Sequence, residues 1–239
     1  MMKKVLIGIA AFLGAGAIVF GALIAINSVN NNSQDYESYK AAMEAFRDAT
    51  NDSSANAITR INNLAESIES TGDYAIIEKA AKSYIRDVLV PYYEIAELQN
   101  KGIYKTGISS GLIKTQQPDF VDALSEINTM NEKLTQVQNI ADSLFLRDAA
   151  EKYLDEDELD KKYIKIFNDE TKRIYDDVKL RQNYYEFVNA YRPKTDYYSK
   201  ILNFLVANKN NWHLDGDKIS FKTTALTNQY NAIVNDKSF

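Results

Sequence analysis

The sequence predicts an all-α protein in which an N-terminal transmembrane helix is followed by an extracytoplasmic antiparallel bundle of four to five helices, a small β-hairpin and a final helix. Three observations predict this fold. One long uncharged apolar segment lies near the N-terminus, and apolar residues then recur at steps of three and four. An alternating pattern appears only near the C-terminus. With 45% hydrophobic residues in 239, the chain is large enough to build a core.

The apolar segment runs from Val5 to Ile26 and contains no charged, amide or hydroxyl side chain. A helix needs about 20 such residues to cross a bilayer, so this segment predicts a single membrane span. Two lysines precede it, and no basic residue follows before Lys40. The bias of positive charge toward the cytoplasm therefore predicts a cytoplasmic stub at residues 1–4 and an external location for the rest.

A cleavable signal peptide is the alternative for this segment, and it would make the protein secreted and membrane-active. Signal peptides usually have a shorter apolar stretch of about 7–15 residues and a cleavage site between small residues. Here the stretch is longer and ends in Ala25-Ile26-Asn27-Ser28, which offers no good small pair. We therefore expect an uncleaved signal anchor in the cell membrane.

The polar stretch 27–38 predicts a flexible linker, and residues 39–210 predict the helical bundle. Apolar steps from Tyr39 to Ile68 predict a first helix, which the polar residues 51–54 divide in two. A second helix is expected over 74–98, with a kink at Pro91.

Further along, the glycine-containing stretch 100–117 predicts a long loop that folds back on the bundle through its apolar residues. Helices are then expected over 119–154 and 159–191. Arg192-Pro193 predicts the end of the latter, and a short fifth helix follows.

Residues 211–239 predict a hairpin and a final helix that pack on the bundle. Trp212, Leu214, Ile219 and Phe221 alternate with polar residues around an Asp-Gly pair, which favours a tight turn. Thr223-Thr224 is expected to cap the last helix.

The composition removes several kinds of chemistry. The chain has no cysteine and one histidine, and it lacks the glycine motifs of nucleotide-binding loops and of hydrolase nucleophiles. The acidic run 155–158 lacks the loop spacing of a calcium site, so a solvated helix junction is the favoured interpretation. We therefore expect no catalytic residue, cofactor or metal site, and no enzyme activity.

Charge argues against a nucleic-acid partner. Removing the two positive charges before the membrane segment lowers the net charge from −5 to −7 for the external part. A polyanion would be repelled by such a domain.

The 16 tyrosines are the most unusual feature outside the membrane segment, and several are adjacent pairs. One member of each pair can lie at the rim of the core, where tyrosine suits protein contacts. Tyr93, Tyr184, Tyr197 and Trp212 are therefore the candidate interaction surface. The alternative, which we favour both for the tyrosines and for Trp212, is that these large rings fill the core.

These features together predict a membrane-anchored external domain that binds another protein, or itself, or serves as a scaffold at the bacterial cell surface. A ligand-sensing domain that signals through a partner membrane protein is the alternative.

Overall fold

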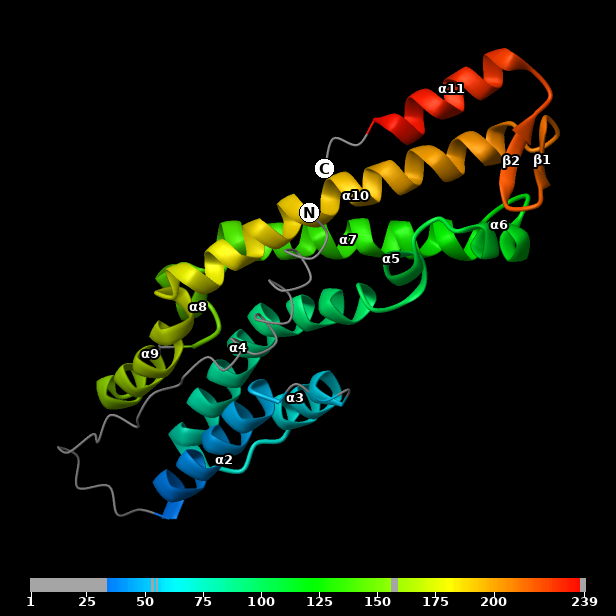
Figure 1. Ribbon diagram of the computed structural model, residues 1–239. Coiled ribbons are helices and arrows are strands. Elements are labelled where there is room, and N and C mark those ends of the chain that lie inside the picture. The colour runs from blue at the N-terminus through cyan, green and yellow to red at the C-terminus, as the bar shows by residue number, and fades with distance from the viewer. Residues whose placement is uncertain (1–33, 53, 55, 156–158, 237–239) are drawn as a thin grey trace. The chain divides into compact units, whose positions relative to one another are not determined.

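In the computed structural model, the chain is described over residues 34–52, 54, 56–155 and 159–236. These residues form ten helices, α2 to α11, and one two-stranded antiparallel sheet (Figure 1). The predicted all-α character with a small hairpin is confirmed. We predicted one bundle over residues 39–210, and its helices belong to two compact units, which are treated separately below.

The predicted transmembrane segment Val5–Ile26 lies outside the described residues. Among the residues that are described, none of the helices is long and apolar enough to span a membrane. The predicted linker 27–38 is wrong at its end, because α2 (Gln34–Thr50) begins at Gln34. Two acidic residues in the first turn favour this start, and one of them, Asp35, accepts a hydrogen bond from the Thr71 hydroxyl.

The first unit contains the described chain up to Val90 together with residues 143–178. It is built from α2, α3 (Ala57–Glu66), the first part of α4 (Gly72–Leu98), α8 (Arg147–Glu151) and α9 (Lys161–Tyr175). The predicted break after Thr50 and the predicted helix ending at Leu98 are confirmed. The core consists of large side chains less than 4% exposed, among them Phe46, Ile61, Ile77, Tyr84 and Phe167.

A buried ion pair lies inside this first unit. The Glu78 and Lys82 side chains are both fully buried, and Lys82 Nζ lies 2.6 Å from Glu78 Oε1. Lys82 also donates to the Ser67 carbonyl at 2.8 Å, and Glu78 accepts from the Ser70 backbone N–H at 3.0 Å. The pair therefore holds the segment between α3 and α4 against α4.

The second unit contains residues 91–142 and the described chain from Lys179 onward. It comprises the end of α4, then α5 (Gly102–Thr106), α6 (Ser110–Gln116), α7 (Val121–Ser143) and α10 (Val178–Ala207), followed by the hairpin and α11 (Thr224–Asn235). Pro91 lies within α4 at the point where the two units divide.

The prediction of a loop over 100–117 is wrong, because α5 and α6 occupy most of it. Side chains supply the partners that these short helices need. The Glu126 carboxylate accepts from the Ile103 N–H at 2.8 Å, and the Ser109 hydroxyl accepts from the Leu112 N–H at 3.2 Å. A Cβ atom at Gly102 would lie 1.9 Å from the Glu126 carboxylate, so this approach requires glycine. The expected burial of this segment is confirmed at Ile103, which is fully buried.

The predicted helix 119–154 is divided, since α7 ends at Ser143 and α8 starts at Arg147. The predicted helix 159–191 is divided too, between Tyr175 and Val178.

The predicted helix end at Pro193 is wrong, because α10 continues through this proline to Ala207. A proline inside a helix costs about 3 kcal/mol, whereas each large apolar side chain buried beyond it contributes about 1.5–3 kcal/mol. Ile201, Leu202 and Leu205 are all at most 3% exposed, so their burial outweighs the proline. The Thr195 hydroxyl also bonds the Tyr191 carbonyl at 2.8 Å beside it.

The predicted hairpin and final helix are confirmed. Strand β1 (Trp212–Asp215) pairs with β2 (Lys218–Phe221), with Trp212 opposite Phe221 and Gly216 at a φ of 62° in the turn. The Thr223 hydroxyl accepts from the Leu226 N–H and caps α11. Helix α11 then runs back along α10 (Figure 1), where the Tyr197 hydroxyl donates to the Val234 carbonyl at 3.1 Å.

Candidate functional site

Two of the four candidate interaction residues lie in the core of the second unit. Trp212 is 7% exposed, stacks on Phe120 and donates its indole N–H to the Leu205 carbonyl at 2.8 Å. Tyr184 is fully buried and stacks on Tyr92, with ring centroids 5.1 Å apart. Neither side chain can therefore contribute to a surface.

The placement of Tyr184 corrects the predicted face of its helix. With Tyr184 chosen as the rim member of the adjacent pair Tyr184-Tyr185, the prediction places Tyr185 inward. The break between α9 and α10 resets the helical phase, so Val178 is 75% exposed while Leu180 and Tyr184 are buried. The Tyr185 hydroxyl instead donates to Asp142 at 2.6 Å on the outside of the unit.

The other two candidate residues remain partly accessible. Tyr93 is half-buried and packs edge-on against Tyr92, and burial raises the pKa of its hydroxyl. Tyr197 is half-buried and lines a groove of about 300 Å³. Tyr197 thus belongs to a concave feature.

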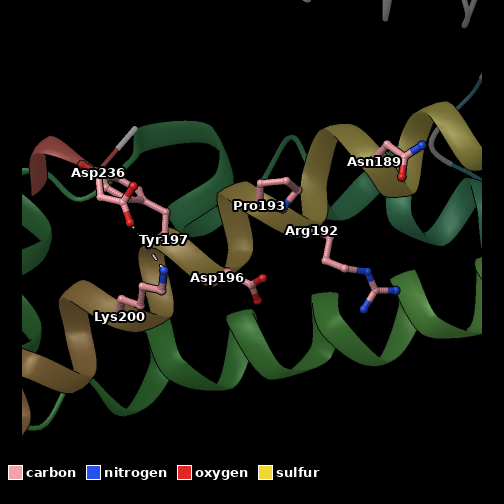
Figure 2. A pocket seen from close by; sticks show the side chains of 7 residues that line it. All are labelled: Asn189, Arg192, Pro193, Asp196, Tyr197, Lys200 and Asp236. Atoms are coloured by element: carbon pink, nitrogen blue, oxygen red, sulfur yellow. Dashed lines mark ion pairs between the residues drawn. The ribbon is translucent and has the colours of Figure 1, made fainter. Parts of the chain in front are cut away.

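This groove, which we call the α10–α11 groove, is formed by one stretch of α10 and the residue that follows α11. Two rows spaced by four residues line it. Its lining residues are Asn189, Pro193 and Tyr197 in one row, Arg192, Asp196 and Lys200 in the other, and Asp236 beyond α11. Figure 2 shows Arg192 and Asp196 projecting from the same side of α10, with Lys200 beside Asp236.

The groove carries charges of both signs. Lys200 Nζ lies 3.7 Å from an Asp236 carboxylate oxygen, and both side chains are more than half exposed. Arg192 donates to the Gln138 side chain at 3.0 Å, which holds its guanidinium at one end of the groove. Pro193 has no N–H to donate to the Asn189 carbonyl, so that carbonyl lacks its usual helical donor from this position. The groove thus presents a fixed cation and exposed carboxylates.

A second arrangement in the same unit surrounds Lys194. Its Nζ lies 5.6 Å from the ring centroids of Tyr191 and Tyr198 and 5.8 Å from that of Tyr104. It donates to the Tyr104 carbonyl at 3.3 Å. Burial lowers the pKa of Lys194. Within the described chain, no carboxylate forms an ion pair with Lys194 that would counter this effect. The lysine fills this ring of tyrosines itself, so the arrangement links α5 to α10.

A third feature lies in the first unit, between α2 and α9. A small cavity there is lined by Tyr39 and Arg47 of α2 and by Ile166, Glu170 and Arg173 of α9, among others. Arg47 lies 3.7 Å from Glu170. Burial, followed by the charges of Glu170 and Glu78, raises the pKa of the Tyr39 hydroxyl well above its usual value. The hydroxyl is therefore neutral and remains a hydrogen-bond donor.

No metal site is assembled in the part of the chain that the structure describes. No group of three His, Asp or Glu side chains there could hold a metal ion. Most of the acidic run 155–158 lies outside the described residues. His213 is exposed on β1.

Sequence reasoning identified Tyr197 but missed the charged row of the α10–α11 groove. The signal of this row is present in the sequence, because Arg192, Asp196 and Lys200 alternate in sign at steps of four and so share one helix face. The expected helix end at Pro193 separated these residues and hid the row.

Comparisons of the chain with protein-family models, with curated proteins and with solved structures find no match.

Proposed function

We propose that this protein is a membrane-anchored, extracytoplasmic helical protein of the bacterial cell surface that acts by binding another protein. In this proposal Val5–Ile26 is the membrane anchor and the N-terminus is cytoplasmic. The α10–α11 groove is the contact surface on the external domain.

The observation that carries the proposal is the composition of the groove. Protein interfaces favour arginine and tyrosine, and they need polar groups that are already positioned. Arg192 is held by Gln138, and the Tyr197 hydroxyl is held by the Val234 carbonyl. Both side chains are thus ordered before any partner arrives, which lowers the entropy cost of binding.

The charges of the groove also indicate which class of partner fits it. Arg192 and Lys200 face two carboxylates, Asp196 and Asp236, so no single sign of charge dominates. A polyanion such as nucleic acid would gain little here, whereas a polar peptide segment with charges of both signs can pair with the cations and the carboxylates of the charged row. An enzymatic role is not proposed, since the groove holds no nucleophile next to a base.

Site-specific crosslinking tests the proposal, and the cysteine-free chain makes it direct. Asp196→Cys places one thiol in the groove of the full-length protein, where a membrane-impermeant maleimide carrying a photoreactive group can label it in intact cells. Gln229→Cys on α11 is the matched control, because it is exposed in the same unit and does not line the groove. We expect labelling at both positions and a discrete crosslinked protein from position 196 alone.

Two results would overturn parts of the proposal. A lack of labelling at both positions in intact cells, with labelling after lysis, would place the domain inside the cell. Equal adducts from both positions, or none from either, would remove the groove as the contact surface. The mass of the protein in the same samples separates an anchored chain of 27.1 kDa from a cleaved one.

A further inference from the structure

The α2–α9 cavity of the first unit holds two buried donors that have no acceptor. Tyr39 is 3% exposed, and its hydroxyl has no hydrogen-bond partner among the described residues. Arg173 Nη1 is buried as well and has no partner there either. Both residues line the same cavity. A buried donor without an acceptor is strongly unfavourable, so a cavity with two of them is matched to a molecule that accepts hydrogen bonds.

The charges around the cavity favour an anion. Three acidic side chains line it, but two of them are already paired: Glu170 lies 3.7 Å from Arg47, and Asp169 lies 2.5 Å from Lys165. The remaining charged side chains of the lining are Lys40 and Arg173, which are positive, and Glu44, which is negative. An acceptor with one negative charge can therefore pair with Arg173 and Lys40, while Arg47 offsets part of the negative charge that raises the pKa of the Tyr39 hydroxyl.

The volume limits the size of that anion. The cavity measures about 40 Å³, whereas a single water needs about 10–15 Å³ on this kind of measure. Three or four heavy atoms fit, which is the size of a carboxylate group. A planar carboxylate also matches the donor geometry of a guanidinium.

From the two unpartnered donors, the charge balance and the volume we infer that the α2–α9 cavity is a binding site for a carboxylate group. Arg173 Nη1 and the Tyr39 hydroxyl donate to its oxygens. This site lies in the first unit and is independent of the α10–α11 groove. It would give the external domain the ligand that a sensor requires.

Thermal unfolding of the full-length protein in detergent micelles tests the inference, with sodium acetate as the probe. Sodium chloride and sodium phosphate at equal ionic strength separate a carboxylate from other anions. We expect acetate to raise the unfolding temperature saturably, by about 3–6 °C at ten times its dissociation constant. Chloride and phosphate should not reproduce the rise.

Two variants each remove one donor. Tyr39→Phe keeps the ring, and because the hydroxyl has no partner, the variant should unfold at the wild-type temperature or above it without acetate. Arg173→Gln removes the guanidinium. Both should lose the acetate-dependent rise, whereas the control Lys172→Gln, which removes a positive charge from the exposed side of the same turn, should keep it.

Three results would overturn the inference. They are an equal rise with chloride or phosphate, a rise that persists in both donor variants, and a Tyr39→Phe variant that is destabilised while acetate has no effect on the wild type. The last result would mean that the hydroxyl bonds a resident water.

Discussion

Each unit of the molecule places a lysine among packed side chains, and the two units stabilise the lysine's positive charge by different contacts. In the first unit, Lys82 is fully buried, pairs with the buried Glu78 carboxylate and bonds one backbone carbonyl. In the second unit, Lys194 is half-buried, bonds one carbonyl and faces three tyrosine rings. The first unit therefore stabilises its lysine with a full opposite charge, and the second with aromatic faces.

This difference has an energetic consequence. Removing one partner of a buried ion pair leaves the other charge buried and uncompensated, which costs about 3–5 kcal/mol. Removing a cation from tyrosine rings leaves only neutral groups behind, and the interaction itself is worth about 0.5–2 kcal/mol. Single substitutions should therefore separate the two units clearly.

The largest effect is expected for Glu78→Gln. The amide keeps the shape of the carboxylate but leaves the Lys82 ammonium buried without a counter-charge, so the free energy of unfolding should fall by about 3–5 kcal/mol. Urea unfolding of the full-length chain measures it.

Glu97→Gln is the matched control for that substitution. Glu97 at the end of α4 and Lys101 just beyond the helix have the same spacing of four residues, but both side chains are exposed. The loss there should stay below about 0.5 kcal/mol. A second control, Glu78→Leu with Lys82→Met, removes both charges and should recover most of the stability. Equal losses at Glu78 and Glu97 would show that burial does not govern the first pair.

A smaller effect is expected from acid. Burial raises the pKa of Glu78, but the hydrogen bonds from Lys82, Ser70 and the backbone outweigh it and hold the pKa below its ordinary value. The stability that Glu78 contributes is therefore complete above its unfolded-state pKa, near 4.3, and is lost as the pH falls toward the lowered folded-state pKa. The gap in unfolding free energy between wild type and Glu78→Gln should be constant from pH 7 to about pH 5 and should shrink below that. A gap that widens in acid would contradict the assignment.

The smallest effect is expected in the second unit, for Tyr104→Phe. Burial raises the pKa of Tyr104 to about 12, and its neutral hydroxyl bonds the buried Thr195 hydroxyl at 3.0 Å. Removing this one neutral hydrogen bond should cost about 1 kcal/mol. The control Tyr198→Phe keeps its ring beside Lys194 and should change the unfolding free energy by less than about 0.5 kcal/mol. A loss of several kcal/mol at Tyr104 would mean that the second unit also depends on a buried polar network.

The comparison also explains what the sequence could and could not predict. The helices and the hairpin follow from local patterns, such as the apolar steps along α4 and the Asp-Gly turn before β2. The burial of Glu78 and Lys82 does not, because a Glu-x-x-x-Lys spacing looks the same on an exposed helix face. Only the segment around Ser67 and Ser70, which packs over that face, makes the pair internal.

The errors in the second unit have the same cause. Pro193 does disfavour a helix locally, as the sequence indicates. The burial of side chains beyond it stabilises the helix by more than the proline costs, so α10 continues. The break at Asp176–Asp177 decides which face of α10 is buried, and no apolar pattern marks this break. Tyr184 is therefore buried and Tyr185 lies on the outside, which is the reverse of the prediction. The candidate residues Tyr184 and Trp212 were identified by type, whereas exposure is set by packing.

The most direct test of the contrast between the two units is one substitution made at both sites. We predict that Lys82→Met lowers the free energy of urea unfolding by about 3–5 kcal/mol, since it leaves the Glu78 carboxylate buried without a counter-charge. Lys194→Met should lower it by less than about 2 kcal/mol, since it leaves only tyrosine rings and one carbonyl. Equal losses at the two positions would contradict the account.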